Sequence, residues 1–321
     1  MIRVLFVIPF FSSALLNAQA ESASLASAGY SFPNPPTVAQ GQVITLFVQG
    51  LQVPNASTSV VPWPTTLSGV TVAVVNPPTP NYPATLPIYS IFSSSTQCAG
   101  GNTSYCNTTA VTVEFPVEPV CIPTGFPDSC NIGGVTVNLA VKTATSQEFP
   151  FFVVRQSPHV LNTCDTIFGT GGICTSVITH ANGTAISDGA PAVPGEVITL
   201  YAVGLGTTQN GTKTGQAATA PDPVTAVPYL SFGFWIDSLT AAGPAPLTLA
   251  QSGQTTPAGY AGLVSGYVGL YQINVTLPST LPSGFHVCQG FADTNLRIFL
   301  GSGPGPSQVS ESPFVDLCMA Q

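Results

Sequence analysis

The chain has 321 residues, of which only 6% are charged, and its formal net charge at pH 7 is −8. Its five Lys and Arg residues are too few to displace the counterions of a nucleic acid, and they give no attraction to an anionic membrane surface. A hydrophobic fraction of 44% argues against disorder, and 31 Gly and 31 Pro residues among short apolar runs are typical of an all-β chain.

Residues 1–20 read MIRVLFVIPFFSSALLNAQA. A basic Arg3, an apolar stretch and the closing Ala18-Gln19-Ala20 predict a secretory signal peptide that is cleaved after this segment. The apolar stretch is too short to span a membrane and is interrupted by Pro9. We therefore expect an exported protein, secreted or held at the cell surface, with no membrane span after cleavage.

One segment of the sequence occurs twice, as VAQGQVITLFVQGLQ at 38–52 and as VPGEVITLYAVGLG at 193–206. In each copy a turn glycine, Gly41 or Gly195, precedes a β-branched run with strand composition. Later segments correspond more loosely: 111–119 with 273–280, 135–141 with 296–300, and 149–154 with 312–317. The repeat predicts two tandem β-sandwich modules of six or seven strands each.

The repeat also sets the expected domain boundaries. After the signal peptide, residues 21–35 form an extended N-terminal arm with no evident partner strand. The first module spans 36–155, a linker with a disulfide loop spans 156–189, and the second module spans 190–321. Within the second module, residues 240–256 resemble an insertion.

The run YAGLVSGYVGLYQINVTLP at 260–278 resembles a motif of an uncharacterised domain family. This family is abundant at the C-termini of secreted acidobacterial (Solibacter-type) proteins. The run from Pro194 to Gly206 and the segment WPTTLSGVTVAV at 63–74 are similar to further motifs of the same family. The resemblance implies an immunoglobulin-like β-sandwich fold for both modules, and it implies no established activity.

Eight cysteines in an exported chain favour disulfide bonds over a metal site. No C-x-x-C occurs, and none of the three histidines has ligand-like spacing to a cysteine, so zinc is disfavoured and no cofactor is expected. Pairing of sequence neighbours predicts four bonds: Cys98–Cys106, Cys121–Cys130, Cys164–Cys174 and Cys288–Cys318.

No catalytic motif stands out in the sequence. The serine-hydrolase pattern G-x-S-x-G is missing, and the histidines His159, His180 and His286 are typical of turns or surface loops. Glu114 and Glu118 flank Pro116 and form a weak candidate for a glycosidase pair. Three further carboxylates, Asp165, Asp188 and Asp293, lack a D-x-D-x-D calcium run. We expect no catalytic, cofactor-binding or metal site, and hence no enzyme.

Trp63 and Trp235 are the candidate ligand-stacking residues. The alternation in YLSFGFWID at 229–237 directs Leu230, Phe232, Phe234 and Ile236 to the core and Trp235 to the opposite face. An exposed tryptophan can stack on a sugar ring. The competing interpretation is that each tryptophan covers the module junction or the insertion.

These observations predict a secreted, non-enzymatic structural or adhesive protein of the cell surface or extracellular matrix. The runs 43–49, 70–75 and 197–203 contain no charged residue, which predicts self-association through strand edges into a homo-oligomer or filament. In that assembly the arm at 21–35 would add a strand to a neighbouring copy. The alternative is a carbohydrate-binding β-sandwich module with a polysaccharide partner.

Overall fold

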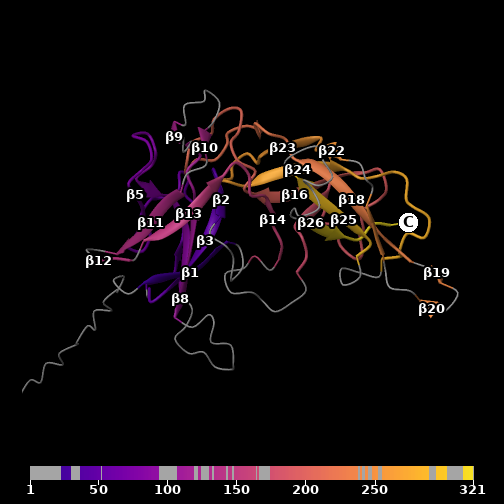
Figure 1. Ribbon diagram of the computed structural model, residues 1–321, viewed down its shortest axis with the longest axis horizontal. Helices are drawn as coiled ribbons and strands as arrows, with labels where there is room; N and C mark the ends of the chain where they lie inside the picture. Colours follow the sequence, from indigo (N-terminus) through magenta and orange to yellow (C-terminus); the bar gives the residue numbers. More distant parts are fainter. Residues whose placement is uncertain are drawn as a thin grey trace, which may run out of the picture.

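The structure, a computed structural model, is built from strands (Figure 1). It describes residues 23–29, 37–51, 53–93, 107–118, 122–123, 130–131, 134–141, 144–146, 148–163, 165, 174–237, 239–240, 243–244, 248–251, 255–288, 294–301 and 314–320. Every regular element in these ranges is a β-strand. Among the same residues, no helix is long and apolar enough to cross a membrane.

The first half of the chain forms two main sheets. Sheet 1 has the order β1 (Ser24–Gly29), β3 (Val43–Gln49), β8 (Thr108–Glu114), β7 (Ile88–Ser93) and β4 (Ala56–Ser57). Sheet 2 has the order β2 (Thr37–Ala39), β13 (Phe149–Val154), β11 (Gly134–Val141), β5 (Val70–Val75) and β6 (Thr85–Leu86), with β12 (Ala144–Thr145) beside β11. A separate hairpin joins β9 (Ile122–Pro123) to β10 (Cys130–Asn131).

The second half repeats this plan. Sheet 3 has the order β14 (His159–Val160), β16 (Val197–Val203), β24 (Tyr271–Thr276), β23 (Tyr260–Leu263) and β17 (Asp222–Pro223), with β15 (Ile178–His180) also on β16. Sheet 4 has the order β21 (Thr248–Gln251), β18 (Tyr229–Ile236), β25 (Leu296–Gly301) and β26 (Phe314–Leu317), with β22 (Thr256–Pro257) also on β18. A small hairpin joins β19 (Leu239–Thr240) to β20 (Gly243–Pro244).

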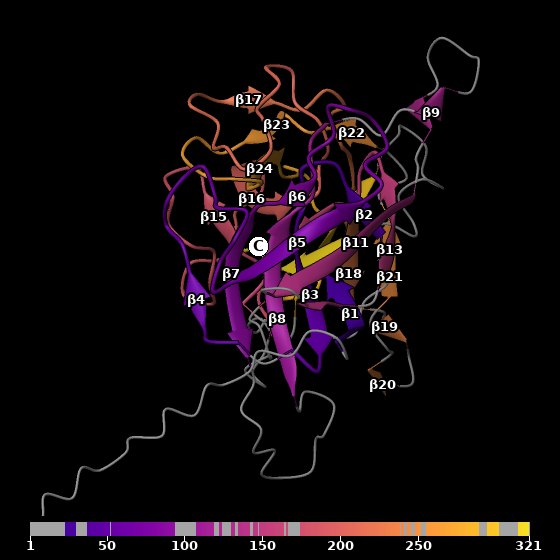
Figure 2. The same ribbon diagram turned by 90° about the vertical axis from the view of Figure 1, so that its left-hand side faces the viewer.

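Each half has its own hydrophobic core. The first core collects inward side chains of sheets 1 and 2, such as Ile44, Val72 and Phe151. The second core collects those of sheets 3 and 4, such as Leu200 and Ile298. The expected alternation in β18 is confirmed for Leu230, Phe232 and Phe234, which lie in the second core. The two halves lie side by side in Figure 1, and Figure 2 shows the first half in front of the second.

The sequence repeat occupies equivalent places in the sheets. β3 pairs with β8 in the first half as β16 pairs with β24 in the second. The turn glycines before β3 and β16, Gly41 and Gly195, have φ values of +68° and +80°, as the predicted turns require. Ahead of each turn runs a parallel contact with the end of its half: β2 pairs with β13, and Ala192 forms a bridge with Met319, just beyond β26. The segment at 240–256, expected as an insertion, supplies β21 at the edge of sheet 4.

Two segments expected outside the two modules belong to the sheets. Residues 24–29 of the expected arm form β1, which pairs antiparallel with β3 of the same chain. Its Ala28 lies in the first core, so the arm already has a partner within its own half. Parts of the expected linker at 156–189 form β14 and β15, and Val160 and Ile178 lie in the second core. Both corrections have one reason, which is that these segments bury apolar side chains between sheets.

The uncharged strands that suggested self-association are not edges. β3 lies between β1 and β8, β5 lies between β11 and β6, and β16 lies between β24 and the pair β14 and β15. Each of these runs therefore has a strand partner on both sides within the chain, and the prediction that they are free edges is wrong. Of the described strands, β1 is an edge that is six residues long and carries no charge.

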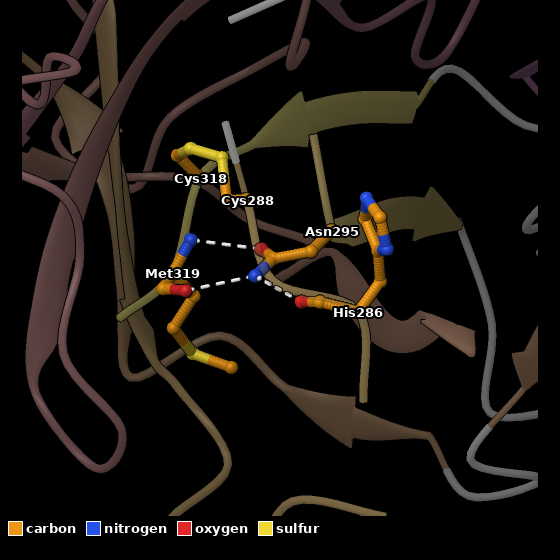
Figure 3. The surroundings of a disulfide bond; sticks show 5 residues. All are labelled: His286, Cys288, Asn295, Cys318 and Met319. Atoms are coloured by element: carbon orange, nitrogen blue, oxygen red, sulfur yellow. Dashed lines mark hydrogen bonds between the residues drawn. A yellow bond between two sulfur atoms is a disulfide. The ribbon is translucent and has the colours of Figure 1, made fainter. Parts of the chain in front are cut away.

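The C-terminal strand is fastened by a disulfide bond and a buried amide (Figure 3). Cys288 and Cys318 are bonded, with their Cα atoms 5.6 Å apart. The side chain of Asn295 is fully buried, donates to the carbonyls of His286 and Met319 at 3.0 and 2.8 Å, and accepts from the Met319 N–H at 2.8 Å. Cys174 is also disulfide-bonded. The pairings proposed for Cys98, Cys106, Cys121, Cys130 and Cys164 involve side chains outside the described part of the chain.

We expect Asn295→Ala to lower the free energy of unfolding by about 2–4 kcal/mol, because it leaves buried backbone groups of His286 and Met319 without partners. Chemical denaturation monitored by circular dichroism measures the change. Asn210→Ala removes an exposed amide and is the matched control. Equal stability of the two variants would show that the Asn295 hydrogen bonds do not fasten the C-terminus.

Candidate functional site

A cleft of about 720 Å³ lies between the two halves. One wall is the outer face of sheet 1 together with the segment 58–63, and the other comes from the second half. The first-half wall includes Val43, Thr45, Val61, Trp63, Tyr89, Phe92 and Thr112, and the second-half wall includes Leu161, Asp165, Val203, Tyr267, Val268 and Leu270. A cleft of this size, mostly apolar with a few polar groups, suits a small molecule or a short segment of a polymer.

Aromatic side chains contribute to both walls of the cleft. Trp63 and Tyr89 form a tilted pair with ring centroids 5.0 Å apart. Tyr89 is 43% exposed, and Tyr267 on the opposite wall is 58% exposed. Trp63 itself is partly buried. These rings present apolar surface to solvent together with polar N–H and O–H groups, a combination common in recognition sites.

The polar groups of the cleft are hydroxyls and one carboxylate. Thr45 and Thr112 bond to each other through their hydroxyls at 3.0 Å across β3 and β8. Asp165 accepts from the backbone N–H of Asn162 at 2.7 Å and pairs with the His159 ring at 2.7 Å. The lining contains an acidic side chain and no Lys or Arg, so its charge disfavours an anionic ligand.

The loop 207–216 of the second half positions Trp63. The Trp63 backbone N–H donates to the Gly215 carbonyl at 3.0 Å. On the other side of the same residue, the Gly215 N–H donates to the Glu114 carboxyl. Next to it the Thr214 hydroxyl donates to Glu118 and accepts from the Val117 N–H at 3.0 Å. Glu114 and Glu118 thus lie together between the two halves and accept hydrogen bonds from backbone and hydroxyl groups of the second half. We call this set of contacts the latch.

Glu114 is an acidic side chain in an almost fully buried position. It is 2% exposed. Burial raises the pKa of Glu114 to about 8; the Gly215 N–H opposes this rise, and the negative charge of Glu118 adds to it. Near neutral pH the side chain is therefore mainly an uncharged carboxylic acid that joins the halves.

Asp222 braces the loop that carries Gly215. This side chain on β17 is 1% exposed and accepts from the hydroxyls of Thr208 and Thr212 at 2.7 and 2.6 Å and from the Asn210 N–H at 2.8 Å. Burial alone would raise the pKa of Asp222, but these hydrogen bonds outweigh it and the net shift is downward. A charged, fully bonded Asp222 therefore fixes the conformation of the loop.

The three histidines are each paired with a carboxylate in different places. His159 pairs with Asp165 beside the cleft, and His286 pairs with Asp237 at 2.8 Å. His180 uses both ring nitrogens, toward Glu196 at 3.0 Å and the Ala190 carbonyl at 3.2 Å. The hydrogen bond with Glu196 raises the pKa of His180. This pair ties the end of β15 to the turn before β16.

The structure separates the two tryptophans. Trp63 lines the cleft, whereas Trp235 lies on β18 in register with Leu249 of β21. The Arg297 guanidinium lies 5.5 Å from the Trp235 ring centroid and is held by two hydrogen bonds to Asp316, both 2.7 Å long. Arg297 and β21 thus lie beside Trp235, and Trp63 is the better placed of the two to meet a ligand.

Of the calcium candidates, the structure describes Asp165 and Asp188. Asp165 pairs with His159, and Asp293 lies outside the described ranges. Across the part of the chain that the structure covers, no cluster of three or more His, Cys, Asp or Glu side chains is arranged to hold a metal ion.

Sequence reasoning missed the latch and the cleft. Both depend on how the second half sits on sheet 1, which no local pattern encodes. One signal was present, since Glu114 follows the apolar run of β8 and precedes Phe115. A lone carboxylate at such a position requires a buried partner.

Comparison with known proteins gives no family. Neither a protein-family model nor a curated protein matches the chain. Among solved structures, the chain is similar to the adhesin InvE of Yersinia pseudotuberculosis, with 9% identity and a TM-score of 0.18. The alignment covers 92% of this chain and 58% of that one. It is also similar to the C-terminal domain of the AgI/II polypeptide BspA of Streptococcus agalactiae, with 8% identity, a TM-score of 0.17 and coverage of 90% and 96%. TM-scores this low carry no argument about fold or function.

The raised pKa of Glu114 predicts that stability depends on pH. Because the folded pKa, about 8, lies above the ordinary value of 4.5, the folded state holds this proton more tightly than the unfolded chain does. The stabilisation is full below pH 4.5 and is lost as the pH rises to about 8. We expect Glu114→Gln to remove this part of the pH dependence and to raise the thermal midpoint at pH 9 by several degrees.

Thermal unfolding of the wild type and the variant at pH 5, 7 and 9 measures this effect. Glu148→Gln changes an exposed carboxylate in the same half and is the control. Parallel pH profiles for the wild type and Glu114→Gln would contradict the assignment.

Proposed function

We propose that the protein is an exported, non-enzymatic adhesive protein of the cell surface or extracellular matrix, built from two immunoglobulin-like β-sandwiches. The observation that carries this proposal is the aromatic cleft shared by the two halves. A binding site formed by both sandwiches fits a protein in which the modules act as one unit. The disulfide between Cys288 and Cys318 is in keeping with export.

The immunoglobulin-like assignment and the acidobacterial family remain parts of this proposal. The strand orders of the four sheets and the two separate cores support a pair of sandwiches. The family motif at 260–278 forms β23, β24 and the turn between them. That hairpin belongs to sheet 3, and its turn contributes Tyr267 and Val268 to the cleft.

A neutral carbohydrate is the second candidate, as the ligand of the same cleft. Sugar rings offer C–H faces that stack on aromatic side chains and hydroxyls that bond to polar groups, and the cleft contains both partners. The Trp63–Tyr89 pair would provide the stacking surface. The Asp165 carboxylate and the net charge of −8 favour a neutral glycan over an acidic one.

We expect Trp63→Ala to weaken binding to a neutral glycan about tenfold, the order of one lost stacking contact. Binding is measured by titrating cellohexaose, chitohexaose and maltohexaose and by sedimentation with cellulose, chitin and starch. Trp235→Ala is the matched control because Trp235 lies away from the cleft. Unchanged binding of Trp63→Ala would rule out the cleft as the site, and no binding by the wild type would rule out these glycans.

Self-association, if it uses a strand edge, is best served by β1. The other described edge strands are shorter: β4, β6, β14 and β17 have two residues each, β2 has three and β21 has four, and β26 has four and carries Asp316. Short or charged edges resist pairing with another chain. β1 has six residues and no charge, although a register shift between Leu25 and Ser27 interrupts its pairing with β3.

We expect Ala26→Lys to reduce self-association, because it places a charge at an exposed position on the free edge of β1. Light scattering over a range of protein concentrations measures particle size. Ala220→Lys adds the same charge to an exposed loop and is the control. A wild type that stays monomeric at high concentration would end the assembly proposal, and equal assembly of both variants would exclude the β1 edge.

A further inference from the structure

The two backbone polar groups of Gly215 connect a buried acid to the wall of the cleft. Its N–H donates to the Glu114 carboxyl, and its carbonyl accepts from the Trp63 N–H at 3.0 Å. Glu114 ends β8, whereas Trp63 lies in the segment between β4 and β5. Within the first half the two are joined less directly, because the Glu114 N–H donates to the Pro87 carbonyl at 3.1 Å and the Ile88 N–H donates to the Pro64 carbonyl at 2.8 Å. Any displacement of Gly215 therefore acts on both residues.

The position of Gly215 is tightly specified. Its φ of +78° is favourable only for glycine, and a Cβ atom there would lie 3.1 Å from the Pro87 side chain. The loop before it is fixed by the hydrogen bonds of Asp222 to Thr208, Thr212 and Asn210. These hydrogen bonds hold residues 208–212, the part of the loop that leads to Gly215.

Apart from the Gly215 N–H, the described groups near Glu114 and Glu118 do little to stabilise a charge on Glu114. Glu118, four residues along the chain, is acidic and accepts from Thr214. From the second half comes Tyr271, buried in β24, whose hydroxyl donates to the Gly206 carbonyl and whose pKa is raised by burial and by the charges of Glu114 and Asp222. Tyr82, whose pKa is raised by burial and by Glu118, lies on the side of the first half. The loop itself carries the exposed Lys213.

We propose that Glu114, Gly215 and Trp63 form a proton-operated device that sets the position of Trp63 in the cleft. With Glu114 protonated, the loop 207–216 docks on the first half and holds Trp63 in the wall. When Glu114 loses its proton, its carboxylate draws in water, the loop withdraws from it, and Trp63 loses its backbone partner. That this device regulates ligand binding in the cleft rests on the proposed function, but the movement of the loop itself needs no ligand.

The pH range of the device follows from its surroundings. Because burial raises the pKa of Glu114 to about 8, the loop is docked in neutral and acidic media and is released in mildly alkaline ones. Among the described residues, the Gly215 N–H is the donor to this carboxyl, and a buried carboxylate needs more donors than one. Withdrawal of the loop lets water supply them.

The fluorescence of Trp63 tests the device directly. In a Trp235→Phe background Trp63 is the one remaining tryptophan. We expect its emission maximum to shift to longer wavelength as the pH rises from 6 to 9.5, with a midpoint near 8. Glu114→Gln should abolish the shift, and Glu118→Gln should move the midpoint to lower pH because it removes a neighbouring negative charge.

Two controls separate this result from other causes. Tyr89→Phe removes the phenol beside Trp63, and the transition should persist, which excludes quenching by an ionised Tyr89. Circular dichroism at each pH shows whether Glu114→Gln is folded. If it is not, the midpoint of the fluorescence transition in Glu118→Gln decides whether the proposal holds. A transition that persists in folded Glu114→Gln, a midpoint unmoved by Glu118→Gln, or no transition in the parent would overturn the proposal. A transition without glycan binding would leave the device intact and count against the glycan alone.

Discussion

The packing of the second half against the outer face of sheet 1 is the constraint on which the rest of the structure depends. An antiparallel sheet of a sandwich normally faces water on one side, and its strands then alternate between apolar and polar residues. β3 does not, because five consecutive residues from Ile44 to Val48 are buried. Its inward side chains lie in the first core, and its outward residues Val43 and Thr45 lie under the second half. The cleft is the part of this junction that remains unfilled.

Burying polar groups at a junction of this kind costs free energy, and the loop 207–216 offsets that cost. The strand end at Glu114 and the following Glu118 leave two acidic groups between the halves, and buried carboxyls without partners are destabilising. Gly215 and Thr214 supply the missing donors. Asp222 holds the loop that carries these donors, since its charged carboxylate accepts hydrogen bonds from Thr208, Asn210 and Thr212. Glu114 is thus neutral and Asp222 charged, and the difference follows from the number of hydrogen-bond donors that each carboxyl receives.

Much of the architecture was predictable from the sequence, because it depends on local patterns. The repeat located β3 and β16, and positive φ values at Gly41 and Gly195 were expected of those turns. β1 was not predicted as a partner of β3, because its run SLASAG lacks bulky apolar residues and buries small ones instead. β14 was not predicted either, because it has only two residues. The site was less predictable than the fold: Trp63 was identified as a candidate from its residue type alone, and its neighbours Tyr89 and Tyr267 come from segments far apart in the chain.

Low charge has a further consequence at the junction. With few ionic groups available, the two halves are joined mainly by apolar contact and by hydrogen bonds to backbone groups, which are less sensitive to salt than ion pairs are. A junction so built responds weakly to ionic strength and strongly to the protonation of the acids it buries. Among the described contacts across the junction, Gln42 to the Ser157 carbonyl and Gly215 to Glu114 each join a side chain of the first half to a backbone group beyond it. Glu118 also crosses the junction, through the Thr214 hydroxyl, so both acids at the junction bond to the loop that carries Gly215, the backbone partner of Trp63.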